Sequence, residues 1–315
     1  MIRADKLSKH YGSVVAVDGV SFSVEAGDIV GLLGPNGSGK TTIMRMLTGF
    51  FAPTSGSCCI AGIDVRTDSR AARRHIGYLP ENIALYPDMS VRAYLGFAAR
   101  TRGFGQNLRR RVDEVMEECG LADMSRRTIG KLSRGYRQRV GIAQAIVHRP
   151  DVLIMDEPTV GLDPRQIVEI RALIRKLAAT STVLLSTHIL PEVSVTCRRV
   201  LILDKGRLVA QDSAEGLSRR TAGRGETYIK LRAPAAEAVT ALSALDGVRG
   251  VDTVDSTPDG IVAVVVATDG GQDLAPQMAS CVLERGWPLY EMSPKLMSLE
   301  ELFVQILEES EVAVP

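Results

Sequence analysis

A glycine-rich segment shows the clearest chemical pattern in the sequence. The segment GPNGSGKT, residues 34–41, follows the apolar run Ile29–Leu33 and precedes a helical pattern. Glycines in such a turn let backbone N–H groups surround phosphates, and the N-terminus of the next helix favours anions. Lys40 would place its charge on the β- and γ-phosphates, and Thr41 would offer a hydroxyl to Mg²⁺. The pattern predicts a nucleotide-binding loop.

Two carboxylates end a second apolar run, DVLIMDEPT, at residues 151–159. Asp156 is placed to hold Mg²⁺, often through water, and Glu157 to orient or polarise an attacking water. An acidic pair at a strand end also commonly caps the following helix. Its position downstream of a phosphate-binding loop favours phosphoryl transfer.

Three further residues have a chemical interpretation and an ordinary one. His188 follows the apolar run TVLL and could contact the γ-phosphate or the attacking water, although a single histidine at a strand end is usually structural. Tyr11 could stack on a base, although a half-buried aromatic is the commoner case. Glu81 could sense Mg²⁺ or the γ-phosphate from a moving loop, and an exposed turn carboxylate explains it equally well.

The stretch KLSRGYRQRV, residues 131–140, raises the same choice. Ser133 is a good N-cap residue, and arginine and glutamine are ordinary helix formers. By itself the stretch predicts a capped surface helix. The turn VGLDP, residues 160–164, similarly predicts a helix start, with Asp163 as N-cap and Pro164 in the first turn.

Composition indicates an ordinary globular chain. The 315 residues carry a net charge of +1, with 45% hydrophobic and 24% charged residues, so no global charge directs the chain to nucleic acid. Basic runs such as Arg109–Arg111 and Arg73–Arg74 are explained by solvated helix faces. No apolar run approaches the ~18–20 residues of a membrane span, and the start lacks a signal peptide. The five cysteines form no C-x-x-C pair and indicate reduced thiols. We expect a cytoplasmic protein.

The order of patterns predicts two domains, at residues 1–220 and 221–315. The first alternates strand-like and helical patterns, typical of an α/β core with a mostly parallel sheet. Short antiparallel strands precede it, and a helical subdomain covers about residues 84–125. A linker at residues 218–227 leads to a β-α-β-β-α-β order, the ferredoxin-like arrangement. A final helix is predicted from Ser298.

Taken in order, the motifs resemble those of the nucleotide-binding subunits of ABC transporters, over roughly residues 2–215. GPNGSGKT resembles Walker A, IGYLPEN the Q-loop region, LSRGY the signature, VLIMDE Walker B and GLD the D-loop. The resemblance implies a P-loop ATPase core with an antiparallel β subdomain and a helical subdomain.

The resemblance also implies roles for individual residues. Glu157 resembles the catalytic base and His188 its partner, while Asp156, Thr41 and Glu81 would hold Mg²⁺. ATP would contact the adenine-stacking Tyr11, the loop residues Gly34, Asn36, Gly37, Ser38, Gly39, Lys40, Thr41 and Thr42, the Q-loop Glu81, and, from the opposite subunit, Ser133 and Gly135.

Two departures from the family pattern stand out. Glu81 replaces the usual glutamine of the Q-loop, and the signature reads Leu-Ser-Arg-Gly-Tyr instead of Leu-Ser-Gly-Gly-Gln. Arg134 would add a cation near the phosphates. Both departures resemble the ABC-2 type exporter branch, especially the gliding-motility-associated ATP-binding subunits.

These resemblances imply an ATPase that pairs with a second ABC subunit and with integral membrane subunits, and that lies on the cytoplasmic face of the membrane through them. We expect no nucleic-acid partner. The alternative is a soluble ABC-family ATPase acting on a non-transport partner, although the chain has one P-loop and no heptad tract. A P-loop GTPase would need an N-K-x-D motif, which is absent.

Overall fold

The computed structural model describes residues 1–105, 107–189, 193, 195–213, 216, 226–257, 259–268 and 274–295. Their contacts divide into two compact units, whose described residues end at Ser213 in the first and run to Lys295 in the second. The predicted helix from Ser298 and most of the predicted linker lie outside the described residues. The linker prediction was wrong at its end, because Glu226 and Thr227 already belong to a strand.

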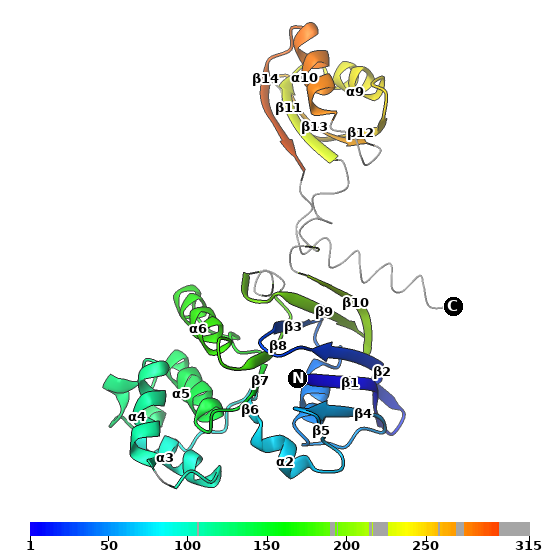
Figure 1. The fold of residues 1–315 in the computed structure, drawn as a ribbon. Coiled ribbons are helices and arrows are strands. Elements are labelled where there is room, and N and C mark those ends of the chain that lie inside the picture. Colours follow the sequence, from blue (N-terminus) through cyan, green and yellow to red (C-terminus); the bar gives the residue numbers. More distant parts are fainter. Residues whose placement is uncertain are drawn as a thin grey trace. The chain divides into compact units, whose positions relative to one another are not determined.

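The first unit contains two sheets (Figure 1). One is antiparallel, in the order β2 (Val14–Val24), β1 (Ile2–Tyr11), β4 (Ser55–Ile60) and β5 (Ile63–Asp64). The other has the order β10 (Arg207–Ser213), β9 (Arg199–Asp204), β3 (Ile29–Leu33), β8 (Thr182–Thr187), β7 (Val152–Asp156) and β6 (Ile76–Leu79). From β9 to β6 this second sheet is parallel, which confirms the predicted α/β core.

Helix α1 (Lys40–Leu47) lies in the core that both sheets share. Its Met44 and Leu47 are fully buried in one cluster with Leu32 of β3, Ile154 of β7 and Ile60 of β4. Strands β3, β7 and β8 are buried along their whole length, as expected for a parallel sheet covered on both faces. The sheet therefore fixes the ends of β3, β7 and β8, where the chemical motifs stand.

The remaining helices of the first unit include the predicted helical subdomain. Those that lie wholly within the described ranges are α2 (Ser69–Arg74), α3 (Val91–Thr101), α4 (Leu108–Glu118), α5 (Arg134–Ile146) and α6 (Pro164–Leu177), with short 3₁₀ turns at Ala122–Met124 and Ile129–Lys131. Helices α3, α4 and α5 pack together, so the helical subdomain extends beyond the predicted residues 84–125 and includes α5.

One predicted surface residue is buried. The basic run at Arg109–Arg111 was interpreted as a solvated face, but Arg111 is only 6% exposed. Its guanidinium donates to the carbonyls of Ile146 (2.8 Å) and Val147 (2.9 Å), at the C-terminus of α5. The last carbonyls of a helix lack partners within it, and the N–H of Arg149 also donates to the carbonyl of Ile146 (3.0 Å). Arg111 adds donors to both carbonyls and ties α4 to α5.

The second unit has the predicted ferredoxin-like order. Its sheet runs β12 (Val248–Ser256), β13 (Ile261–Thr268), β11 (Glu226–Arg232) and β14 (Leu289–Pro294), all antiparallel. Helices α9 (Ala235–Ser243) and α10 (Ala275–Glu284) bury Leu242 and Met278 against Ile229 and Val264 of this sheet. The unit has its own hydrophobic core.

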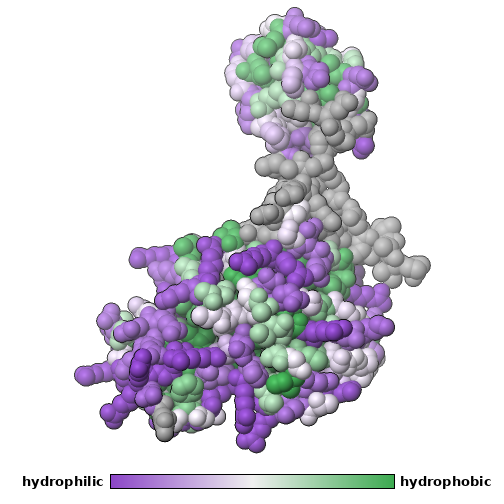
Figure 2. All heavy atoms as spheres, viewed as in Figure 1, coloured by the Kyte–Doolittle hydropathy of each residue, from purple (hydrophilic) through white to green (hydrophobic). Residues whose placement is uncertain are grey.

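In the view of Figure 2 the first unit is largely hydrophilic, with hydrophobic side chains in small separate patches. No helix in the described ranges combines the length and the apolar character that crossing a membrane requires.

Candidate functional site

The ends of β3, β7 and β8 meet at one cavity of about 470 Å³. Its described lining includes Asn36, Gly37, Gly39, Lys40, Thr41, Thr42, Glu81, Glu157 and His188, all predicted site residues, together with Ala16 and Val160. Residues that lie more than 140 positions apart in the chain thus face one space because parallel strands end at the same edge of the sheet.

The glycine-rich loop at residues 34–41 connects β3 to α1. Gly37 and Gly39 have φ angles of 83° and 101°, in the left-handed region that favours glycine. Gly39 is the N-cap of α1, so the first N–H groups of this helix face the loop rather than a capping side chain. A loop of this kind before a helix N-terminus is suited to phosphate groups.

Lys40 lies in this loop with its ammonium group buried. Its Nζ donates to the carbonyls of Gly34 (2.8 Å) and Pro35 (3.0 Å), and it lies 3.9 Å from Glu157 Oε1. Burial lowers the pKa of Lys40, and the carboxylates of Glu157, Asp156 and Glu81 oppose that shift. The ammonium group therefore stands among carbonyls and carboxylates, at a point where an anionic ligand would stabilise its charge.

Glu157 follows β7 and is 8% exposed. Nδ1 of His188 lies 3.1 Å from both of its carboxylate oxygens. The φ angle of Glu157 is 48°, which is uncommon for a residue with a side chain. This backbone conformation brings the carboxylate to the mouth of the cavity, beside His188 and Lys40.

Ser186 links the carboxylate of Asp156 to the backbone of Glu157, and sequence analysis did not identify it. Its hydroxyl donates to Asp156 Oδ1 (2.6 Å) and accepts from the backbone N–H of Glu157 (3.0 Å). Asp156 itself is 1% exposed and does not line the cavity. The only signal in the sequence is that Ser186 precedes His188 by two residues, at the end of a buried strand.

A serine hydroxyl of the glycine-rich loop is buried without a partner among the described residues. Ser38 is 2% exposed, and its Oγ has no hydrogen-bond partner among the described residues. Buried polar atoms are almost always paired, so an exception in a native structure calls for an explanation. A phosphate group in the loop would provide an acceptor near this hydroxyl.

Five predicted ligands of the nucleotide are absent from the described lining of the cavity: Gly34 and Ser38 of the loop itself, and Tyr11, Ser133 and Gly135. Tyr11 packs edge-on against Phe51, with ring centroids 6.1 Å apart, and Lys9 Nζ lies 5.3 Å from its ring centroid. Ser133 is the N-cap of α5 and accepts from the backbone N–H of Tyr136, and Gly135 is in the first turn of that helix. The capped helix predicted at residues 131–140 is therefore present.

Metal chemistry at this site would need oxygen ligands. Among the described residues, no group of three or more His, Cys, Asp or Glu side chains is arranged to hold a metal ion. The hydroxyl of Thr41 and the carboxylate of Glu81 line the cavity, with Asp156 behind it. Such a set fits Mg²⁺, which usually takes one or two carboxylates and completes its shell with water and phosphate oxygens.

Comparison with known proteins agrees with this geometry. The sequence profile of the family described as ABC transporter matches residues 17–160, a range that includes the loop and Glu157. The Nod factor export ATP-binding protein I of Paraburkholderia xenovorans is 39% identical over 218 residues, covering 69% of this chain and 72% of its own length.

The chain belongs to the ABC transporter family. It is an ATP-binding subunit of that family, an ATPase that acts with membrane subunits. The similarity extends over both units, because the uncharacterized ABC transporter ATP-binding protein YdbJ of Bacillus subtilis is 34% identical over 97% of this chain and 94% of its own.

A solved structure of the family gives the same fold. The dimeric structure of MJ0796, a bacterial ABC transporter cassette, superposes with a TM-score of 0.63 at 25% identity. It covers 68% of this ATPase subunit and 99% of the cassette. The superposed part leaves about a third of the chain unmatched.

Proposed function

We propose that this ATPase subunit hydrolyses Mg²⁺-ATP between two copies of the chain, and that the closing and opening of the pair drives an exporter of the ABC-2 type. The observation that carries the proposal is the carboxylate of Glu157. It is nearly buried, lies at the mouth of the phosphate-loop cavity, and has His188 Nδ1 at 3.1 Å and Lys40 Nζ at 3.9 Å. A carboxylate in this position can orient a water for attack on the γ-phosphate.

The loop side chains and N–H groups would hold the phosphates. Lys40 would exchange the carbonyls of Gly34 and Pro35 for the β- and γ-phosphate oxygens, a stronger, charge-assisted interaction. Thr41, Asp156 and Glu81 would hold Mg²⁺, which neutralises charge on the phosphates when bound. The remaining assigned phosphate ligands are Gly34, Asn36, Gly37, Ser38, Gly39 and Thr42.

Closure by a second copy would complete the site. Ser133 and Gly135 stand at the start of α5 and are absent from the lining of their own chain's cavity. An exposed helix N-terminus is suited to a γ-phosphate presented by a partner. Tyr11, 44% exposed, would stack on the adenine base after turning from Phe51.

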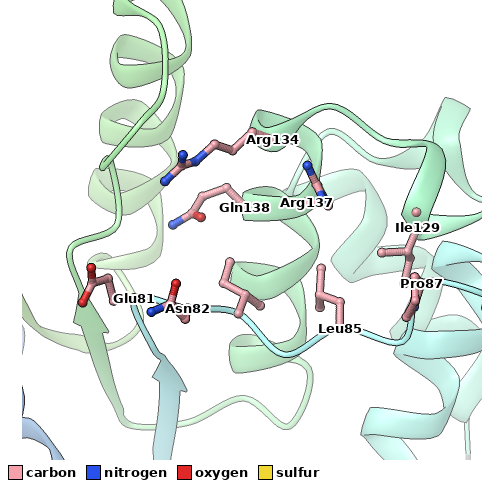
Figure 3. A pocket seen from close by; sticks show the side chains of 10 residues that line it. Glu81, Asn82, Leu85, Pro87, Ile129, Arg134, Arg137 and Gln138 are labelled. Atoms are coloured by element: carbon pink, nitrogen blue, oxygen red, sulfur yellow. The ribbon is translucent and has the colours of Figure 1, made fainter.

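The membrane subunit would dock beside the helical subdomain. Figure 3 shows a cavity of about 390 Å³ whose lining includes Glu81, Asn82, Leu85, Pro87, Ile129, Arg134, Arg137 and Gln138. Next to it Tyr86, 55% exposed, packs edge-on against Tyr94 and Phe97 with centroids 6.0 and 5.7 Å away. Because Glu81 lines both cavities, a partner at one would affect the other.

The localisation of the chain and the direction of transport depend on this membrane partner. Bound to an integral membrane subunit, the chain would lie on the cytoplasmic face of the membrane. Export is favoured by the relative that exports Nod factors. Purification in detergent with a multi-span membrane protein is the expected result for a tagged full chain, and a preparation containing only soluble partners would favour the alternative of a non-transport ATPase.

The hydrolytic role is tested by Glu157→Gln, which keeps the size of the side chain and removes its charge. We expect the rate of ATP hydrolysis to fall by about 100-fold or more, because the carboxylate is assigned to the attacking water. Phosphate release by the full chain with saturating Mg²⁺-ATP measures this rate. Glu25→Gln, at an exposed glutamate, is the matched control, and a wild-type rate in Glu157→Gln would exclude the assigned role.

A further inference from the structure

Arg134 occupies a signature position where the family usually has glycine, and its side chain contacts its own chain. A Cβ atom built on Gly161 would lie 2.2 Å from Cζ of Arg134 and 2.3 and 2.5 Å from its Nη atoms. The guanidinium group therefore lies directly against the backbone of the D-loop, in the space that a side chain at 161 would need. Within the described residues, no hydrogen bond or ion pair involves this guanidinium, so the contact is one of packing.

Two further contacts join the first turns of α5 to the same segment. Nε2 of the buried Gln138 donates to the carbonyl of Pro158 at 2.6 Å, and a Cβ atom on Gly135 would lie 2.6 Å from Cδ of Gln166. In Figure 3 the side chains of Arg134 and Gln138 extend from α5 in the same direction. Helix α5 thus contacts the chain at 158, 161 and 166, on both sides of the D-loop.

The segment that receives these contacts begins at Glu157. Its backbone is tightly turned, with N–H of Val160 donating to the carbonyl of Glu157 (3.3 Å) and N–H of Leu162 to that of Thr159 (3.2 Å). Gly161 has a φ angle of 70° and Glu157 one of 48°. These hydrogen bonds link successive residues of the turn, so the position of Gly161 is coupled to that of Glu157.

We propose that Arg134 is a positioning residue for Glu157. Its flat guanidinium braces the D-loop against α5, so the position of the signature turn, Ser133 to Tyr136, sets the position of the carboxylate in the same chain. The inference rests on the proposed hydrolytic site and adds a residue to it. It gives the guanidinium a role in its own chain through its shape, in addition to the expected role of its charge near phosphates.

A double-mutant cycle tests the contact. Arg134→Ala removes the guanidinium, and Gly161→Ala places a methyl group where it lies. Each single variant is expected to lower kcat by about tenfold, since small displacements of a catalytic group cost that much or more. In the double variant the methyl group meets empty space, so we expect a kcat no lower than that of the worse single variant. The backbone strain of alanine at 161 occurs in both backgrounds and cancels from the cycle.

Arg134→Lys separates packing from charge. Lysine keeps the charge but lacks the planar group, so its kcat should fall nearly as far as that of Arg134→Ala. Nucleotide affinity, measured by titration of a fluorescent ATP analogue, should stay unchanged in every variant, because the loop at residues 34–41 is intact. Arg126→Ala, at an exposed arginine of the same subdomain, is the control for the loss of a surface charge.

Two results would overturn the proposal. Losses that multiply in the double variant would mean that Arg134 and Gly161 act independently, and a wild-type kcat in Arg134→Lys would mean that only the charge matters. Failure of the proposed function gives a different result: Glu157→Gln would then hydrolyse ATP as fast as the wild type.

Discussion

Glu157 combines two features that are rare in one residue, a nearly buried carboxylate and a left-handed backbone conformation. Such a conformation costs of the order of 1–3 kcal/mol and persists where surrounding structure fixes it. Ser186 contributes to that, since its hydroxyl holds the backbone N–H of Glu157 and the carboxylate of Asp156 together. The strain is located where the carboxylate must face both His188 and the phosphate loop.

His148 should make the stability of the protein depend on pH. Burial, with a contribution from Arg102, lowers the pKa of His148 from 6.5 to about 4, while its Nε2 lies 2.9 Å from the carbonyl of Ile76. Between these two values the unfolded chain binds more protons, so this stabilisation is complete above pH 6.5 and is lost as the pH falls toward 4.

Urea unfolding at pH 7 and pH 5 measures this effect. The loss at pH 5 should be on the order of 1 kcal/mol after screening by solvent. His148→Gln should make the curve flatter between these pH values, and the comparison removes the contribution of other acidic groups. An equal loss in both proteins would show that His148 does not cause it.

At the scale of residues, the sequence predicted the groups that share one motif or one sheet edge. Lys40, Glu157 and His188 lie close together because each follows a buried parallel strand. These strands are recognisable in the sequence as apolar runs. Ser186 was missed because serine at a strand end is common and its two partners depend on rotamer and backbone geometry. The direction of the Arg134 side chain could not be predicted either, since a long exposed side chain has many rotamers.

At the scale of elements, two predicted helix starts are present where a capping residue defined them. Ser133 and Asp163 accept from the backbone N–H groups of Tyr136 and Gln166, as their N-cap positions predict. Arg111 was wrongly predicted to lie on a solvated face. A run of basic residues in α4 does not reveal which other helix packs against it. Its partner carbonyls, at the end of α5, lie 35 and 36 residues away in the chain.

Ser133, at the N-terminus of α5, should contact the ATP that is bound by a partner subunit. Ser133→Arg places a bulky side chain at the exposed N-terminus of α5, so we expect hydrolysis to be lost while ATP binding, which belongs to the loop at residues 34–41, is kept. Phosphate release and titration of a fluorescent ATP analogue measure the two properties. Ser243→Arg, at an exposed serine of the second unit, is the control, and a variant that loses ATP binding would argue against a half-site that acts on the partner.

At the scale of the whole molecule, the proposed site needs residues that its own cavity does not contain. The cavity at Lys40 contains the phosphate loop, the carboxylate and the histidine, but neither Ser133 nor Gly135. A second copy placed with its α5 toward the cavity would supply both. The order of the motifs led to the prediction that Ser133 and Gly135 act on a partner's nucleotide. The cavity beside Tyr86 could not be predicted in this way, because it depends on side chains from α5 and from the segments at 81–87 and 129–130.

The mass of the Glu157→Gln chain in solution tests the central claim most directly. With Mg²⁺-ATP the variant should retain its nucleotide, because it binds ATP and hydrolyses it slowly. Light scattering should then report about 68 kDa, twice the 34.0 kDa of one chain, and one chain's mass without nucleotide. A mass of one chain at saturating ATP would contradict a site completed by a second copy.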